Sequence, residues 1–180
     1  MSLWDRIDEE SKGPLEALRE ALPGGLNGIP DIVARRAAMS ASRAAAPKGE
    51  YPDLTVSVHT YSGPGGDLSL RLYRPNDAAS PGPGLIYIHG GDMIMGDLDS
   101  QDENMRETAT ALGIPIASID YRKAPEHPYP AAPEDCYAGV CWVFEHATDL
   151  GMNISNIGLM GASAGGGLAL AVALMLRDRD

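Results

Sequence analysis

Residues 157–166 read Ile-Gly-Leu-Met-Gly-Ala-Ser-Ala-Gly-Gly. The apolar run that opens this stretch predicts a strand, and the Ala- and Leu-rich residues from Ala164 to about Arg177 predict a helix. Between them, Gly161 to Gly165 fit the pattern Gly-x-Ser-x-Gly, in which small residues let a sharp strand-to-helix turn lift a serine hydroxyl out of a sheet. Because the pattern lies where this turn is needed, we predict that Ser163 is a catalytic nucleophile. The alternative is a glycine-rich turn that only lets a strand and a helix pack closely.

A second glycine turn, His89-Gly90-Gly91, directly follows the apolar run Leu85 to Ile88. Glycines at a strand end let backbone amides converge on a substrate carbonyl oxygen, and each donor of such an oxyanion hole contributes about 3 kcal/mol to the transition state. Taken alone, this turn would be a common strand end. Together with the serine turn downstream, it predicts an oxyanion hole beside Ser163.

The pattern from residue 85 onward predicts an α/β fold with a mostly parallel sheet. Leu85 to Ile88, Ile114 to Ile119 and Ile157 to Met160 are short, nearly continuous apolar runs, as expected of parallel strands covered on both faces. Helical patterns separate these runs, which is typical of an α/β fold. The first helix is expected to begin at a capping box, Ser100-x-x-Glu103, and the second near Pro133.

The N-terminal part of the chain has other periodicities. Leu54 to Val58 and Leu68 to Leu72 alternate apolar with polar residues, and the Gly- and Pro-rich turn between them predicts an antiparallel hairpin. Residues 1–50 show helical spacing, with Pro14 expected at the first position of a helix. We therefore divide the chain into a helical segment, 1–50, and an α/β domain, 51–180.

Composition limits the partners and the compartment. With a formal net charge of −11, the chain would repel nucleic acid and anionic membranes, so we expect neither as a partner. Cys136 and Cys141 lie on one predicted helix and form no disulfide framework, which favours a reducing cytoplasm. Met1 to Glu10 lacks the basic start and apolar run of a signal peptide, and the apolar stretch Leu168 to Leu176 is too short to cross a bilayer.

Four blocks of the sequence, in this order, resemble the bacterial hormone-sensitive-lipase-like carboxylesterases of the α/β-hydrolase fold. They are His89-Gly90-Gly91, Gly96 to Ser100, Tyr121 to Ala132 and Gly161 to Gly166. The resemblance implies hydrolysis of small-molecule esters with short or medium acyl chains, without a cofactor. It implies an α/β-hydrolase-type sheet with an antiparallel N-terminal hairpin and helices on both faces. It also makes residues 1–50 part of a cap over the acyl pocket.

The resemblance assigns roles to the residues of the two turns. Ser163 would attack the ester carbonyl, while the backbone amides of Gly90, Gly91 and Ala164 would bind the oxyanion. His89 is expected to hold the oxyanion turn by hydrogen bonds.

We expect the acidic residues near the predicted site to have structural roles and not to bind a metal ion. The place of Glu126 inside the third block favours a supporting role around the serine. Asp97, Asp99 and Asp102 surround a predicted helix start, where the helix dipole favours negative charge, so we expect no metal site there.

The chain departs from the family after the nucleophile. In this fold the acid and then the histidine of the catalytic triad follow the serine, but all four histidines of this chain precede Ser163. We therefore expect the C-terminal part of the fold to be absent and the 180-residue chain to have little activity. Strand 157–160 would then expose an edge that favours aggregation or pairing with a second copy, giving a homo-oligomer.

Asp92 stands where the family usually has a third glycine. A carboxylate about 5 Å from the developing oxyanion would cost roughly 3 kcal/mol at an effective dielectric of 20. If the Asp92 side chain points to water, screening by the water removes most of this cost. Aspartate tolerates the left-handed conformation better than most residues, so we expect the turn to survive.

Two other functions stay open on the sequence alone. A non-catalytic ligand-binding module of the same fold, such as the plant gibberellin receptor, keeps the pocket but has lost the triad histidine. Intact Ser163 argues against this reading. The other alternative is an inactive gene fragment, which the missing sheet strands would favour.

Overall fold

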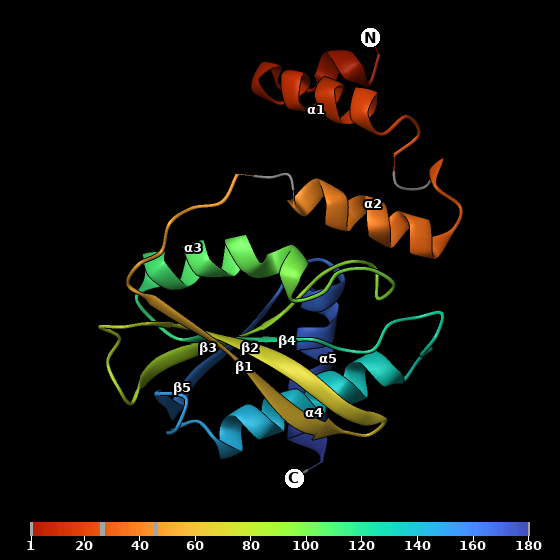
Figure 1. The fold of residues 1–180 in the computed structure, drawn as a ribbon. Coiled ribbons are helices and arrows are strands. Elements are labelled where there is room, and N and C mark those ends of the chain that lie inside the picture. The colour runs from red at the N-terminus through yellow and green to blue at the C-terminus, as the bar shows by residue number, and fades with distance from the viewer. Residues whose placement is uncertain (1, 26–27, 45–46, 180) are drawn as a thin grey trace. The chain divides into compact units, whose positions relative to one another are not determined.

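The computed structural model describes residues 2–25, 28–44 and 47–179. The chain divides into two compact units, Met1–Ala44 and Ala45–Asp180, and this division falls a few residues before the boundary expected at Glu50. The described residues of the first unit include a short 3₁₀ helix, η1 (Trp4–Arg6), and the α-helices α1 (Glu9–Ala21) and α2 (Ile32–Ala44) (Figure 1).

The helix start expected at Pro14 is wrong. Helix α1 begins at Glu9, because the Asp8 side chain accepts a hydrogen bond of 2.9 Å from the Glu10 amide and so caps the first turn. Pro14 therefore lies inside the helix. The aspartate cap at Asp8, upstream of Pro14, decides where the helix begins.

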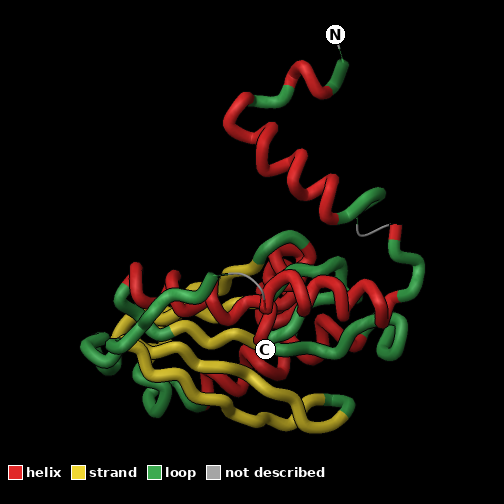
Figure 2. Tube along the Cα trace, turned by 45° about the horizontal axis from the view of Figure 1, so that its top comes forward, coloured by secondary structure: helices red, strands yellow, loops and turns green. Residues whose placement is uncertain are grey.

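The second unit is built on a five-stranded sheet of order β1-β2-β4-β3-β5 (Figure 2). Its strands are β1 (Leu54–Gly63), β2 (Gly66–Pro75), β3 (Gly82–Ile88), β4 (Ile116–Ile119) and β5 (Met152–Gly161). Strands β1 and β2 form an antiparallel hairpin, which joins the sheet because β2 also pairs antiparallel with β4. Strand β3 runs parallel to both β4 and β5. The predicted hairpin and parallel strands are confirmed.

Helices cover both faces of this sheet, as predicted (Figure 1). A 3₁₀ turn, η3 (Asp99–Gln101), leads into the first of three α-helices, which are α3 (Asp102–Leu112), α4 (Ala131–Glu145) and α5 (Ala164–Asp178). Ile86 and Ile88 of β3 pack in the core formed with α4 and α5, whereas Tyr87 packs in the core formed with α3. Within the described residues, no helix is both long enough and apolar enough to cross a membrane.

Strand β5 lies at one edge of the described sheet, where it pairs with β3. All four residues of β4 are buried, as predicted for a strand covered on both faces. The same prediction is wrong for β5, because Ile154 is 58% exposed and residues 157–161 are only half-buried. Leu170 and Leu174 of α5 are also exposed. An edge strand and the helix beside it have fewer neighbours than central elements, which explains these exposed apolar side chains.

The capping box expected at Ser100 and Glu103 is wrong. Ser100 lies in η3, where its backbone N–H donates to Oδ1 of Asp97 (2.7 Å) and its hydroxyl accepts from the Asp97 N–H (3.0 Å). This reciprocal pair joins Ser100 to Asp97 instead of to Glu103, and it lies at η3, before α3 begins. Glu103 accepts hydrogen bonds from the Gly49 amide and the Tyr51 hydroxyl. It therefore ties the start of the second unit to α3.

Candidate active site

Ser163 lies between the end of β5 and Ala164, the first residue of α5, with backbone angles of φ 52° and ψ −120°. A non-glycine residue rarely adopts such angles, and strain of this kind costs about 1–3 kcal/mol. Helix α5 begins so close to β3 that a Cβ on Gly165 would lie 2.1 Å from the carbonyl oxygen of Ile88. The Ser163 side chain is exposed and does not cap α5. The structure thus places the serine hydroxyl at the surface of a sharp strand-to-helix turn.

The glycine turn after β3 lies directly beside this serine. A Cβ built on Gly90 would lie 3.4 Å from Cβ of Ser163 and 2.7 Å from the carbonyl oxygen of Ala162. Gly91 has a φ of 125°, in the region that favours glycine, and its carbonyl accepts a hydrogen bond of 2.8 Å from the Met95 amide. The structure therefore brings together the two turns that the sequence predicted as parts of one site.

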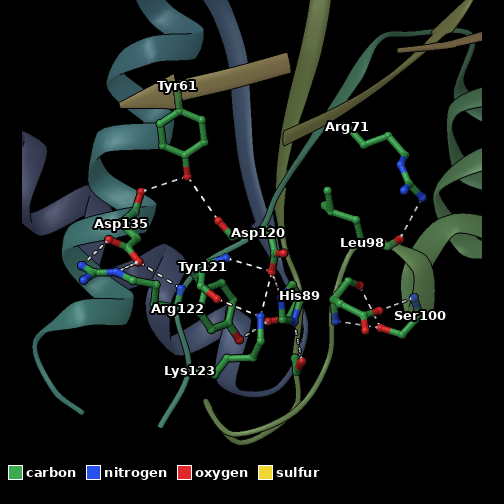
Figure 3. A network of polar contacts seen from close by, with 12 residues as sticks. Tyr61, Arg71, His89, Leu98, Ser100, Asp120, Tyr121, Arg122, Lys123 and Asp135 are labelled. Atoms are coloured by element: carbon green, nitrogen blue, oxygen red, sulfur yellow. Dashed lines mark hydrogen bonds and ion pairs between the residues drawn. The ribbon is translucent and has the colours of Figure 1, made fainter. Parts of the chain in front are cut away.

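The His89 ring is fully buried among side chains from the end of β4 (Figure 3). Its Nδ1 lies 2.8 Å from the carbonyl oxygen of Gly90, and the ring stacks on Tyr121 with centroids 4.3 Å apart. The Tyr121 hydroxyl donates a hydrogen bond of 2.9 Å to the His89 carbonyl oxygen. These contacts attach the glycine turn to the segment that follows β4.

Asp120 and Lys123 complete this network (Figure 3). Oδ1 of Asp120 accepts hydrogen bonds from the Lys123 ammonium (2.8 Å) and the Tyr121 amide (3.0 Å), and it lies 3.5 Å from Nε2 of His89. Burial raises the pKa of the Asp120 carboxyl, but the adjacent His89 ring and the Lys123 charge outweigh burial and hold that pKa below its usual range.

The depressed pKa of Asp120 predicts a loss of stability in acid. A carboxyl with a lower pKa in the folded state stabilises the fold above its unfolded-state pKa, near 3.8, and this contribution is lost as the pH falls through the folded-state pKa. We expect the urea midpoint of the wild-type chain to fall more steeply below about pH 4 than that of Asp120→Asn, which has no carboxylate to protonate there. Equal slopes for the two proteins would contradict this expectation.

Asp92 and Met93 continue the glycine turn after β3, with left-handed φ angles of 55° and 61°. Both side chains are exposed, which favours the case in which water screens the Asp92 charge. That charge still helps to raise the pKa of the Tyr121 hydroxyl, although burial is the largest cause. Glu126 is exposed in the segment between β4 and α4, and its supporting role stays a prediction.

The sequence did not predict the charged pairs that lie near the glycine turn, in the segment after β4 and on α4. Besides Asp120 and Lys123, these include Asp135 of α4, which is buried and accepts hydrogen bonds of 2.7 to 2.9 Å from the Arg122 amide and guanidinium. A signal was available, because residues 120–123 directly follow a buried parallel strand. Sites in open α/β sheets gather at the carboxyl ends of such strands.

The acidic residues near α3 have other partners. Asp99 and Asp102 both pair with Arg71, at 2.7 and 2.9 Å, while Asp97 bonds to Ser100. In the part of the chain that the structure describes, no group of three or more His, Cys, Asp or Glu side chains is arranged to hold a metal ion.

A serine on a strained strand-to-helix turn, beside a glycine turn at the end of the neighbouring parallel strand, is the arrangement of an α/β hydrolase. The family model described as "alpha/beta hydrolase fold" matches residues 85–180. The chain therefore belongs to this family.

Its relatives are esterases, which confirms the resemblance carried by the four sequence blocks. Carboxylic ester hydrolase LipN of Mycobacterium tuberculosis is 42% identical over 159 residues, covering 86% of this chain and 42% of LipN. The acetyl esterase of Salmonella typhi is 40% identical over 130 residues, covering 72% of this chain and 40% of that enzyme. The chain thus spans about 40% of the length of these curated relatives.

Solved structures show the same likeness. Ester-hydrolase EH1AB1 from the metagenome of Lake Arreo superposes with a TM-score of 0.86 at 31% identity, over 96% of this chain and 56% of that one. A hyperthermophilic esterase from the archaeon Pyrobaculum calidifontis superposes with a TM-score of 0.72 at 36% identity, over 83% of this chain and 48% of that one.

Proposed function

We propose that Ser163 is the nucleophile of a serine hydrolase that cleaves small carboxylic esters. The observation that carries this proposal is the approach of the Gly90 Cβ position to within 3.4 Å of Cβ of Ser163. This short separation supports a site in which one carbonyl group reaches both the Ser163 hydroxyl and the backbone amides of the glycine turn. The names of LipN and of the acetyl esterase support an ester substrate, and the second supports a short acyl chain.

In the proposed reaction, Oγ of Ser163 attacks the carbonyl carbon and the alcohol leaves, so that the acyl group remains on the serine. Water then hydrolyses this acyl-enzyme to the free acid. The backbone N–H groups of Gly90, Gly91 and Ala164 would bind the negative charge that develops on the carbonyl oxygen. The positive end of the α5 dipole adds to this field. These steps require no cofactor.

The reaction also needs a general base. Each of the four histidines of this chain lies in a different setting. His89 is buried against the Gly90 carbonyl, His59 and His146 both contact Trp142, and His127 is exposed before α4. We propose that the triad acid and histidine come from sequence outside these 180 residues. The share of LipN that this chain spans, 42%, supports that proposal.

Hydrolysis of p-nitrophenyl butyrate tests the proposed function. We call the chain extended after residue 180 by a segment that supplies the triad acid and histidine the completed form. We expect turnover by the completed form and none by its Ser163→Ala variant. A completed form that unfolds cooperatively and binds esters without turnover would indicate a ligand-binding module. One that does not fold cooperatively would favour the gene-fragment interpretation.

Replacing Asp92 by glycine in the completed form is expected to raise both stability and rate. Glycine relieves a left-handed backbone at φ 55°, by about 1 kcal/mol, and it removes a negative charge beside the oxyanion. Because the side chain is exposed, we expect only a several-fold rise in kcat/KM for p-nitrophenyl butyrate. Asp92→Asn removes the charge but not the backbone strain, so it should raise the rate without raising the urea midpoint. A slower reaction in both variants would show that the carboxylate assists catalysis.

Further assignments follow the family resemblance. We propose that residues 1–50, which include the unit Met1–Ala44, form part of a cap over the acyl pocket, and that 51–180 belong to the hydrolase domain. A cytoplasmic location is supported by two free thiols, Cys136 and Cys141. The exposed edge of β5 would let two copies pair, and the oligomeric state measured by sedimentation tests this.

A further inference from the structure

The hydroxyl of Tyr121 holds the first peptide unit of the glycine turn after β3 (Figure 3). It donates a hydrogen bond of 2.9 Å to the carbonyl oxygen of His89. Because a carbonyl oxygen only accepts, the hydroxyl must be the donor. The His89 carbonyl and the Gly90 N–H belong to one planar trans peptide unit and therefore point in opposite directions. Holding the carbonyl oxygen thus fixes where the Gly90 N–H points.

The same peptide unit packs against the start of α5. A Cβ on Gly165 would lie 2.6 Å from the His89 carbonyl oxygen, so only glycine fits there. On the next residue of the turn, a Cβ built on Gly90 would lie 3.4 Å from Cβ of Ser163. The direction of the Gly90 N–H is therefore set directly beside the proposed nucleophile, where a small rotation of the peptide unit changes what this N–H can reach.

The Tyr121 side chain is itself held in place. Tyr121 is 1% exposed, and its ring stacks on the His89 ring with centroids 4.3 Å apart and planes 15° apart. The ammonium of Lys123 lies 5.2 Å from the centre of the Tyr121 ring. The next residue, Arg122, anchors the backbone, because its N–H and its guanidinium bond to the buried carboxylate of Asp135 at 2.7 to 2.9 Å. The oxygen that donates to His89 therefore belongs to a firmly packed side chain.

The Tyr121 hydroxyl keeps its hydrogen at neutral pH. Burial is the largest cause that raises its pKa above the ordinary value of 10.0, and the negative charge of Asp120 raises that pKa further. The hydrogen bond to the His89 carbonyl is therefore available throughout the neutral range in which ester hydrolysis is measured.

We propose that Tyr121 is a positioning residue of the proposed oxyanion hole: its hydroxyl holds the His89 carbonyl oxygen and thereby directs the Gly90 N–H toward the oxyanion. The proposal rests on the proposed function in taking the Gly90 N–H as an oxyanion donor. Without the hydroxyl, the buried carbonyl loses its donor, which is costly. The peptide unit then rotates toward another donor, and the Gly90 N–H turns with it.

Kinetics of the completed form test the proposal with two matched variants. Tyr121→Phe keeps the ring and removes only the hydroxyl. Tyr73→Phe is the control, because Tyr73 is also buried and its hydroxyl donates a hydrogen bond of 3.0 Å to Oδ1 of Asp102, in α3. We expect Tyr121→Phe to lower kcat and kcat/KM for p-nitrophenyl butyrate by the same factor, about 10-fold, because an oxyanion donor acts in the transition state. Tyr73→Phe should leave both constants close to those of the completed form.

The direction of the Gly90 N–H can be measured without any activity assay. In the ¹⁵N-labelled 180-residue chain, the residual dipolar coupling of an amide in a weakly aligning medium reports the direction of its N–H bond. We expect the Gly90 coupling to change in Tyr121→Phe, while the couplings of the central strand β4 keep their wild-type values. In Tyr73→Phe we expect the Gly90 coupling of the wild type. A general loss of stability would not single out Gly90 in this way.

The two measurements together decide the proposal. An unchanged Gly90 coupling in folded Tyr121→Phe would overturn it, and so would a changed coupling with an undiminished kcat. An equal loss of kcat in Tyr73→Phe would also overturn it, because the effect would then be one of general stability. If the completed form has no esterase activity, the proposed function fails, whereas the coupling still shows whether Tyr121 directs the Gly90 N–H.

If Tyr121→Phe does not fold, the wild-type chain still decides. With tyrosine labelled with ¹³C at the ring carbon that bears the hydroxyl, a hydroxyl that is held and exchanges slowly gives two resonances in an equal mixture of H₂O and D₂O. We expect two resonances for Tyr121. A single averaged resonance would overturn the proposal, because it would mean that the hydroxyl does not stay on the His89 carbonyl oxygen.

Discussion

The 180-residue chain is expected to hydrolyse p-nitrophenyl butyrate on the order of 10⁶-fold more slowly than the completed form, which is the size of loss seen when a serine hydrolase loses its histidine. Without a general base the Ser163 hydroxyl stays protonated and is a weak nucleophile. The glycine turn at Gly90 and Gly91, which we propose as the oxyanion hole, remains in place beside it. Weak catalysis above the background in water is therefore expected to survive.

Three proteins make this prediction decisive when they are compared at equal concentration: the 180-residue chain, its Ser163→Ala variant and the completed form. Rapid turnover by the short chain that disappears in Ser163→Ala would contradict the prediction. It would mean that one of the upstream histidines, or a histidine of a second copy, acts as the base. Rapid turnover that remains in Ser163→Ala would point to a contaminating esterase, because the oxyanion turn alone supports only weak catalysis.

Gly165→Ala is expected to lower the free energy of unfolding by about 2 kcal/mol or more, whereas Gly167→Ala is expected to raise it by up to about 1 kcal/mol. Both glycines lie in α5. A Cβ on Gly165 would be 2.1 Å from the Ile88 carbonyl oxygen and 2.6 Å from that of His89, and backbone atoms cannot move aside cheaply. A Cβ on Gly167 meets nothing within 4 Å, so that variant gains only the better helix propensity of alanine.

Urea unfolding of the two variants and the wild type measures this difference. Gly165→Ala should also perturb the oxyanion turn, because the carbonyl groups that it displaces belong to the residues just before Gly90. Equal stabilities for the two alanine variants would show that α5 does not press against the end of β3 as the structure has it. The close packing of α5 against β3, from which we infer the sharp turn at Ser163, would then be contradicted.

The elements with a clear period could be predicted from the sequence. The hairpin of β1 and β2 alternates, β4 is a continuous apolar run, and α5 follows the serine motif directly. The capping box at Ser100 could not be resolved, because Asp97 and Glu103 each lie three residues from it. Glu103 instead accepts a hydrogen bond from the hydroxyl of Tyr51, a residue distant in sequence, and no local pattern reports this contact.

Exposure of β5 was also beyond the sequence pattern. A short apolar run looks the same in a central strand as in an edge strand, because periodicity reports only how side chains alternate. The position of β5 in the sheet, next to β3 alone among the described strands, decides its exposure.

The candidate site could be predicted where local motifs carry it and not where tertiary contacts do. The turns at Gly90 and Ser163 follow from short glycine patterns next to strands. The network of His89, Asp120 and Lys123 joins the ends of two parallel strands, and no spacing along the chain reports such a contact.

Labelling of the completed form with a fluorophosphonate, followed by peptide mass spectrometry, tests the central claim that Ser163 is an activated nucleophile. We predict a phosphonyl adduct on the peptide that contains Ser163, and no adduct in Ser163→Ala. Ester turnover without labelling of Ser163, or an adduct on another residue that abolishes turnover, would contradict the account.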